Sequence, residues 1–247
     1  GGTLVQAQRP IGAGDMNATA RVGWVVDAQV DFLDPEGRLY VKDLSDDTDR
    51  GSVQIMTALE RALAWMTADC DIVVYTGDWH ALDDDEIDPD SPDPAAGTYP
   101  PHCMGRSGDP DEQEGAAIMP SIRPANPIVL PHDVGAEEAR IVARTAVSEH
   151  LPVFVHKTRF DVFKGNSGTD AFLKGLSMAL GMSLEFFVVG VARDVCVTQA
   201  IDGMQARDYH VTALSDAMWG LGLEPETATL GRWAEKGRVT TVNQVAG

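Results

Sequence analysis

The chain has 247 residues, of which 44% are hydrophobic and 23% are charged, and these values are ordinary for a folded globular protein. A chain of this length can bury about 70% of the surface that it exposes when unfolded, so it needs neither disulfides nor a structural metal to hold a core. The 38 acidic residues outnumber the 19 basic ones and leave a net charge of −19. Because such a surface repels phosphate groups, nucleic acid and anionic membranes are not expected partners.

The sequence offers no obvious membrane-spanning segment. Its longest apolar run, residues 186–192, is far shorter than the roughly 20 residues that a span requires. No basic stretch followed by an apolar one opens the chain, so a secretion signal is not expected. The three cysteines are few and odd in number, which is typical of a reducing compartment. We therefore expect a cytoplasmic protein.

Short apolar runs alternate with amphipathic stretches along the chain. The apolar runs predict six buried strands, at residues 21–26, 71–76, 152–155, 185–189, 211–214 and 239–242. Apolar residues at helical spacing predict helices at residues 49–68, with Asp49 as a possible N-cap, and at 136–150, 169–180, 196–207 and 225–236. Strands that are apolar throughout are typical of a parallel sheet covered on both faces. The pattern predicts one α/β domain, built on a doubly wound, Rossmann-like, mostly parallel sheet of six strands with helices on both faces.

One segment departs from this alternation. Residues 81–98 are rich in Asp and Pro and contain almost nothing that could be buried. We interpret most of this segment as a solvated acidic loop inserted into the domain. The domain itself is expected to span residues 21–247, after an N-terminal extension at residues 1–20.

Chemically active residues follow four of the predicted strands. Asp27 follows the first strand, Asp78 and His80 follow the second, Lys157 follows the third and Cys196 follows the fourth. Open parallel sheets bind their ligands beyond the carboxyl ends of the strands, where the connecting loops converge. We therefore expect these side chains to face one site, and the combination of an acid, a lysine and a cysteine suggests nucleophilic catalysis.

Cys196 has the setting of a reactive thiol. It opens a predicted helix, and the amino end of a helix stabilises a thiolate. A nearby ammonium group such as that of Lys157 would lower the thiol pKa further, and the free N–H groups of the preceding turn could form an oxyanion hole. The alternative is an inert buried cysteine, which is the more common fate of a lone cysteine.

Asp78, His80 and His102 could bind a metal ion. In an extended segment the side chains of Asp78 and His80 point to the same face, and His102 can approach from the far end of the acidic loop. Zinc, iron and manganese all accept one carboxylate and two imidazoles. The alternative is a simple hydrogen bond between Asp78 and a histidine. For Cys103, next to His102, packing is more plausible than metal binding.

Five segments resemble the isochorismatase-like cysteine hydrolases and occur in the order seen in that family. These segments are residues 25–32 (VVDAQVDF), 76–80 (TGDWH), 98–103 (TYPPHC), 155–157 (VHK) and 189–197 (VGVARDVCV). The resemblance extends from about residue 21 to residue 242. Within the family, the metal-type residues indicate similarity to nicotinamidase/pyrazinamidase, an activity of NAD salvage.

The resemblance implies a role for each matching residue. Asp27, Lys157 and Cys196 match the catalytic triad, and the backbone N–H groups of Ala192 and Cys196 match the oxyanion hole, next to a cis peptide bond between Val191 and Ala192. Asp78, His80 and His102 match the ligands of one divalent ion, zinc or else iron or manganese, and Glu86 stands where some relatives have an additional ligand. Phe32 and Tyr99 match the aromatic residues on either side of the substrate ring.

The resemblance also shows where this chain departs from nicotinamidases. Arg193 replaces a residue that is usually Thr, and residues 158–166 differ from the segment that commonly follows the lysine. The expected function is hydrolysis of a small carboxamide, nicotinamide to nicotinate and ammonia, through a thioester on Cys196. The alternatives are a related amidohydrolase acting on an N-carbamoyl or other small amide, a hydrolase that depends on the metal alone, and a non-catalytic ligand-binding protein. The expected partners are the small amide and further copies of the chain in a homo-oligomer.

Overall fold

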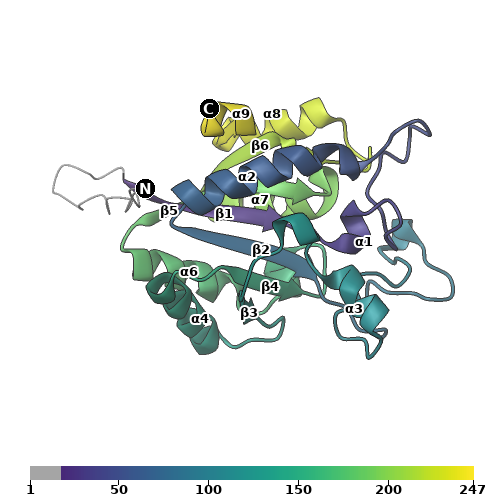
Figure 1. Ribbon diagram of the computed structural model, residues 1–247, viewed down its shortest axis with the longest axis horizontal. Helices are drawn as coiled ribbons and strands as arrows, with labels where there is room; N and C mark the ends of the chain where they lie inside the picture. The colour runs from purple at the N-terminus through teal and green to yellow at the C-terminus, as the bar shows by residue number, and fades with distance from the viewer. Residues whose placement is uncertain (1–17) are drawn as a thin grey trace.

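The computed structural model describes residues 18–247, so the N-terminal extension expected at residues 1–20 lies almost entirely outside the described residues. One parallel sheet forms the centre of the protein (Figure 1), with its strands in the order β3-β4-β2-β1-β5-β6-β7. The strands are β1 (Thr19–Val26), β2 (Ile72–Asp78), β3 (Ile128–Leu130), β4 (Val153–Lys157), β5 (Ser183–Val191), β6 (His210–Trp219) and β7 (Arg238–Thr240). Every neighbouring pair of strands is parallel. The α/β class predicted from the sequence is confirmed.

The sheet has seven strands where the sequence pattern predicts six. The additional strand is β3, which has only three residues and lies at the edge of the sheet beside β4. A run this short carries no periodicity, and Val129 in its middle is exposed. β1 begins at Thr19, two residues earlier than predicted, and the last predicted strand ends at Thr240.

Helices cover both faces of the sheet. The helices are α1 (Val30–Leu33), α2 (Met56–Asp69), α3 (Pro110–Ala116), α4 (Ala136–Glu149), α5 (Val162–Gly165), α6 (Thr169–Leu180), α7 (Thr198–Ala206), α8 (Glu226–Lys236) and α9 (Val242–Ala246). α1, α2 and α9 pack on one face, and α4, α6, α7 and α8 pack on the other (Figure 1). α4, α6, α7 and α8 lie within two residues of where their apolar periodicity predicts them. α1, α3, α5 and α9 are too short to show a period.

The central strands are buried because the residues of each strand alternate between two hydrophobic cores. In β1, Trp24 points into the core under α4, α6 and α7, where its ring meets the edge of Phe186 from β5 at 5.7 Å. Val25, the next residue, points into the core under α2. Both side chains are fully buried, which explains why residues 22–26 of this strand are all apolar.

The helix predicted at residues 49–68 begins later than expected. Its first regular turn is Ser52–Ile55, preceded by Gly51, and α2 follows directly. Asp49 does not cap this helix, because its carboxylate accepts hydrogen bonds from the Asp43 backbone and from the Trp219 indole. The acid therefore ties the segment before α2 to the end of β6.

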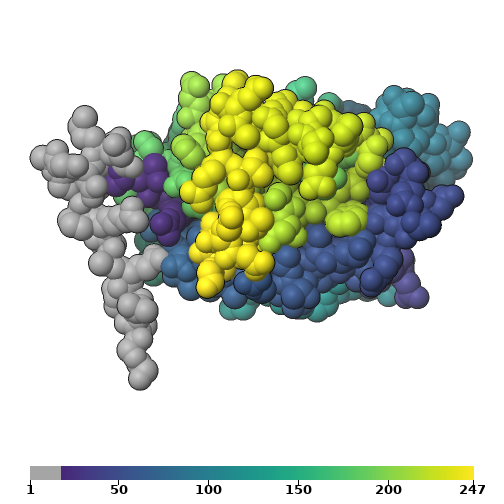
Figure 2. Space-filling view, turned by 90° about the horizontal axis from the view of Figure 1, so that it is seen from above, coloured from purple at the N-terminus to yellow at the C-terminus, as the bar shows by residue number. Residues whose placement is uncertain are grey.

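The carboxyl ends of the strands all point to one end of the protein. The segment after α1 and the acidic loop lie at this end, opposite the start of β1 (Figure 2). Gly190 lets β5 approach β1 closely here, since a Cβ atom at this position would lie 2.1 Å from the Val26 carbonyl oxygen. Among residues 18–247, no helix has both the length and the apolar character needed to cross a membrane.

Candidate active site

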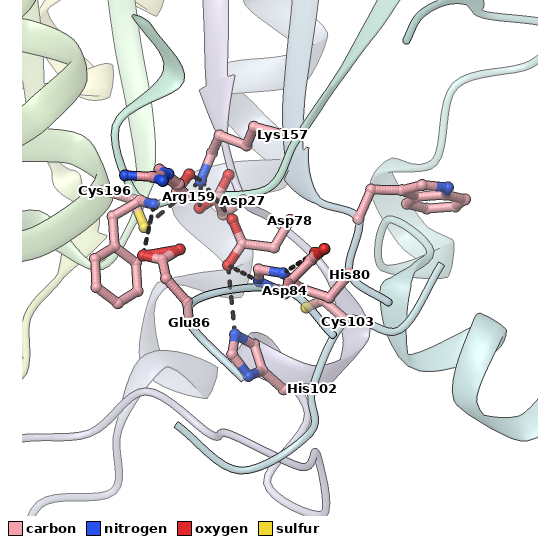
Figure 3. Close-up of polar contacts among 12 residues, drawn as sticks. Asp27, Asp78, His80, Asp84, Glu86, His102, Cys103, Lys157, Arg159 and Cys196 are labelled. Carbon is pink, nitrogen blue, oxygen red and sulfur yellow. Dashed lines mark hydrogen bonds and ion pairs between the residues drawn. The ribbon is translucent and has the colours of Figure 1, made fainter. Parts of the chain in front are cut away.

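Four neighbouring strands bring Asp27, Asp78, Lys157 and Cys196 together at their carboxyl ends, as the sequence predicts. Lys157 lies at the centre of this group (Figure 3). Its Nζ atom lies 2.9 Å from Asp27 Oδ2, 2.5 Å from Asp78 Oδ1 and 3.8 Å from Cys196 Sγ. A further hydrogen bond goes to the Arg159 carbonyl at 3.2 Å. All four side chains are buried, so the lysine links the acid and the thiol in a site shielded from water.

The two carboxylates keep Lys157 charged. Burial alone would lower the pKa of its amine, but Asp27 and Asp78 raise that pKa well above the ordinary value. For Asp78, burial acts to raise the pKa, but the ammonium of Lys157 and the nearby imidazoles hold it well below the ordinary value. A lysinium ion and an aspartate ion therefore face each other permanently.

The pKa of the Cys196 thiol is shifted in the direction opposite to the one expected from Lys157 and the helix terminus. Burial raises the pKa of Cys196 well above the ordinary value, although Lys157 acts in the opposite direction. Burial likewise raises the pKa of Asp27, in spite of Lys157. Burial therefore favours the protonated thiol, which lies in the same buried group as a carboxylate of raised pKa. Sequence reasoning missed this because desolvation is set by the packing around the helix start.

Two polar side chains that the sequence reading did not single out fix the acids. Thr76 donates a hydrogen bond from Oγ1 to Asp27 Oδ1 at 2.8 Å. Gln29 accepts a hydrogen bond from the backbone N–H of Asp78 and donates to the Asp78 and Ala116 carbonyls. Thr76 and Gln29 lie within the segments that resemble the family, and their place in these segments could have identified them from the sequence.

The turn between β5 and α7 carries the cysteine. The peptide bond between Val191 and Ala192 is cis, as the resemblance implies. The Ala192 carbonyl accepts the backbone N–H groups of Val195 and Val197, which folds residues 193–197 into a tight helical turn around Cys196. The backbone amides of Ala192 and Cys196 thus belong to one rigid turn.

Asp78, His80 and His102 converge on one point, as predicted. Asp78 Oδ2 lies 3.4 Å from Nε2 of each histidine (Figure 3). All three atoms are buried and have no hydrogen-bond partner within residues 18–247, and all lie within 4.8 Å of one another. Buried polar atoms without partners are costly unless a ligand satisfies them. The trio therefore fits a divalent cation in both its donor chemistry and its geometry.

The remaining nitrogen of each imidazole is bonded on the outer side of the trio. His102 Nδ1 lies 2.8 Å from the Pro100 carbonyl oxygen, and His80 Nδ1 lies 2.8 Å from Asp84 Oδ2. Burial would lower the pKa of His80, but Asp78 and Asp84 raise it to about 9. Positive charge is therefore favoured at this ring, and a bound cation would take the place of the Nε2 proton.

Glu86 reaches the site from the acidic loop but lies outside the metal-ligand group of Asp78, His80 and His102. Its Oε2 atom accepts the Phe160 backbone N–H at 3.2 Å, and its buried Oε1 atom has no partner among the described residues. Burial raises the pKa of Glu86 to about 7. The structure thus places Glu86 between Cys196 and the trio (Figure 3) without assigning it to the cation.

Aromatic rings enclose the same space. Phe32 lies against His102 with ring centroids 5.5 Å apart, and Tyr99 approaches His102 edge-on at 6.2 Å. Phe160, which the sequence reading noted only as a departure, meets Tyr99 edge-on at 5.1 Å. Cys103 is buried by packing, and its backbone N–H donates to Asp31 Oδ2 at 2.8 Å, which supports the interpretation that it is not a ligand.

Comparison with solved structures shows the same fold in amidases. The chain has 18% identity to N-carbamoylsarcosine amidase from Thermoplasma acidophilum, covering 93% of this chain and 100% of that one, with a TM-score of 0.61. It has 17% identity to nicotinamidase/pyrazinamidase from Bacillus subtilis, covering 90% and 100%, with a TM-score of 0.60. Pyrazinamidase of Pyrococcus horikoshii, in complex with zinc, has 17% identity, covering 90% and 98%, with a TM-score of 0.58.

The family comparison matches the second half of the sequence. Residues 131–244, which include Lys157 and Cys196, match the isochorismatase domain. A comparison with curated proteins finds no significant match. The domain match in the second half of the chain and a fold shared along about 90% of the chain both agree with the resemblance that the motifs indicate: residues 131–244 match the isochorismatase domain, and the chain has the fold of solved isochorismatase-like hydrolases.

Proposed function

We propose that this protein is a cysteine amidohydrolase that cleaves a small carboxamide, and that its substrate is nicotinamide, which it converts to nicotinate and ammonia. The observation that carries the proposal is the buried contact of Lys157 with Asp27 and Cys196, directly beside the trio of Asp78, His80 and His102. Structural likeness to nicotinamidases supports it at the level of the fold.

Asp27 acts as the general base and then as the general acid. It takes the proton of the Cys196 thiol, and the sulfur attacks the amide carbon to form a C–S bond. Asp27 then gives the proton to the amide nitrogen, the C–N bond breaks and ammonia leaves. Water attacks the resulting thioester and gives up a proton that returns to the sulfur, so the carboxylic acid leaves and the free thiol is restored.

Lys157 and the turn before α7 supply the electrostatics of this reaction. The ammonium offsets the negative charge as the proton moves between the thiol and Asp27, because it lies within contact distance of both. The N–H groups of Ala192 and Cys196 stabilise the charge on the carbonyl oxygen, and one such donor is typically worth about 3 kcal/mol. Phe32 and Tyr99 provide flat walls for a ring.

The divalent ion would be held by Asp78, His80 and His102, where it would supply a positive charge that attracts a ring nitrogen or a water molecule. A cation would also add positive charge beside the buried carboxylates of Asp27, Asp78 and Glu86. The ion itself is expected to be zinc, iron or manganese.

A panel of small amides with detection of ammonia tests the proposal. Nicotinamide and pyrazinamide should be hydrolysed readily. Benzamide has nearly the same shape but lacks the ring nitrogen, and a site built for a polar contact rejects such an analogue by about 10⁴ or more. Equal kcat/KM for benzamide and nicotinamide would remove the role of the ring nitrogen. Retained activity in Cys196→Ala would remove the thioester and leave a hydrolase that depends on the metal alone.

A second candidate is an amidohydrolase for N-carbamoyl compounds. The observation that favours it is Arg159, whose side chain is half exposed and pairs with Asp85 of the acidic loop at 2.8 Å. A guanidinium group is well suited to a substrate carboxylate, which nicotinamide lacks. N-carbamoylsarcosine therefore belongs in the panel, and a preference for it over nicotinamide would decide for this candidate.

A further inference from the structure

We propose that Asp84 and Arg106 are positioning residues that hold His80 in the orientation and tautomer required to bind the divalent ion. The inference rests on the metal site of the proposed function and concerns two residues outside the five family-like segments. Both lie around the acidic loop, at the carboxyl end of β2 (Figure 3 shows Asp84).

Asp84 is the least exposed member of the acidic run at residues 83–85. Its side chain is 11% exposed, whereas that of Asp85 is 78% exposed. Asp84 Oδ2 lies 2.8 Å from His80 Nδ1 and also accepts the Ala81 backbone N–H at 3.2 Å. The carboxylate therefore meets the nitrogen of His80 that faces away from Asp78.

Arg106 fixes this carboxylate from the other side. Its Nη2 atom lies 2.5 Å from both oxygens of Asp84, so a charged pair stands behind the histidine. Its Nε atom donates to the Trp79 carbonyl at 2.9 Å, and its backbone N–H donates to the His80 carbonyl at 3.1 Å. Arg106 thus holds the backbone of residues 79–80 together with the acid that contacts the His80 ring.

These contacts decide which nitrogen of His80 is free. With Nδ1–H donated to Asp84, the lone pair of the neutral ring is on Nε2, which points at Asp78 Oδ2 beside His102. A carboxylate on the outer nitrogen also makes the imidazole a stronger ligand, and loss of such a partner typically costs 10- to 100-fold in metal affinity. The outer nitrogen of His102 contacts the neutral Pro100 carbonyl, whereas the outer nitrogen of His80 contacts a charged carboxylate.

Direct measurement of metal affinity tests the proposal without reference to turnover. The metal-free protein and its variants are titrated with Zn²⁺ in competition with a chromophoric chelator. We expect Kd to rise roughly 10- to 100-fold in Asp84→Ala, and less in Asp84→Asn, whose amide oxygen can still accept Nδ1–H. Arg106→Gln should weaken binding in the same direction, and the loss in Asp84→Ala/Arg106→Gln should be smaller than the sum of the two single losses, because Arg106 acts in part through Asp84.

Asp85→Asn is the matched control. It removes an acidic charge at the next position of the loop, one that pairs with Arg159 and does not contact His80, so Kd should remain within about twofold. A nitrogen NMR spectrum of the imidazoles provides a second readout. The zinc-loaded protein should show Nδ1–H in His80, and this tautomer signal should weaken or exchange faster with solvent in Asp84→Ala.

The outcomes separate this inference from the proposed function. Unchanged zinc affinity in folded Asp84→Ala, or an equal loss in Asp85→Asn, overturns the positioning role. If Asp84→Ala fails to fold, the Arg106→Gln titration and the tautomer signal decide. A wild-type protein that binds no zinc also overturns the inference, whereas amide hydrolysis and alkylation of Cys196 remain separate tests of the thiol chemistry. Zinc binding that depends on Asp84 in a protein without amidase activity leaves the inference standing and overturns the function.

Discussion

Asp27 combines two properties that rarely occur in one carboxyl group, because it is fully buried and also contacts a lysine and a threonine. Asp27→Asn keeps the shape of the side chain and one acceptor oxygen, but it cannot take a proton. We therefore expect a folded protein whose kcat/KM falls by about 10²- to 10⁴-fold, which is the usual contribution of a general base. Steady-state release of ammonia measures this change, with the exposed Asp90→Asn as the control. Full activity in Asp27→Asn would assign the base to another residue.

His156 makes stability depend on pH. Its ring stacks on Trp79 at 4.0 Å, its Nε2 atom has no partner among residues 18–247, and burial lowers its pKa from 6.5 to about 4. Between these values the unfolded chain binds a proton that the folded protein refuses, so stability falls as the pH decreases from 6.5 towards 4. The loss amounts to roughly 3 kcal/mol when complete.

His156→Phe keeps the stacking and removes the titration. We expect its free energy of unfolding, measured with urea, to change less between pH 7.5 and pH 5 than that of the wild type. The comparison is a difference between two proteins under the same conditions, so the other histidines cancel. Equal pH dependence in the two proteins would show that His156 does not titrate in this way.

The single residues also show what the sequence could reveal of the site. Asp27, Asp78, Lys157 and Cys196 could be predicted because the carboxyl ends of parallel strands meet. Asp84 and Arg106 could not, since an acid in an acidic run is no different from its neighbours until the fold buries one of them. The thiol pKa was predicted in the wrong direction because burial outweighs the effect of Lys157.

At the scale of the elements, α4 and α6 pack unusually closely through a glycine. A Cβ atom on Gly175 in α6 would lie 2.9 Å from the Ala143 side chain and 3.2 Å from the Arg140 backbone of α4. Gly175→Ala should therefore lower the free energy of unfolding by about 1–3 kcal/mol. Gly231 in α8 has open space around it, so Gly231→Ala should instead stabilise the protein by about 0.5–1 kcal/mol. Urea unfolding of both variants tests the opposite signs, and a shared sign would contradict the packing argument.

The elements differ in how well the sequence predicts them. α4, α6 and α8 were predicted to within a residue or two because each has several turns of apolar periodicity. β3 and α1 were missed because three or four residues cannot show a period, and their structure depends on neighbours such as β4.

At the scale of the whole molecule, the charge of −19 opposes folding through repulsion between like charges. Salt screens this repulsion, since the Debye length falls from about 30 Å at 0.01 M to about 8 Å at 0.15 M. We expect Tm at pH 7.5 to rise by several degrees over this range of NaCl concentration. Near pH 4.5, the isoelectric point, the rise should largely disappear, and an equal rise at both pH values would point to an effect other than net charge.

Asp78 has one oxygen in each half of the site, with Oδ1 on Lys157 and Oδ2 facing the two imidazoles. An ion bound at Oδ2 would weaken the hold of Oδ1 on the ammonium and leave Lys157 to interact more strongly with Asp27 and the thiol. We therefore expect metal occupancy and thiol reactivity to be thermodynamically linked, and such a linkage is reciprocal. Carboxamidomethylation of Cys196 should change zinc affinity, and zinc should change the rate at which iodoacetamide modifies that cysteine. Through this one aspartate, an ion held by the trio would change the reactivity of the Cys196 thiol even when no substrate lies between them.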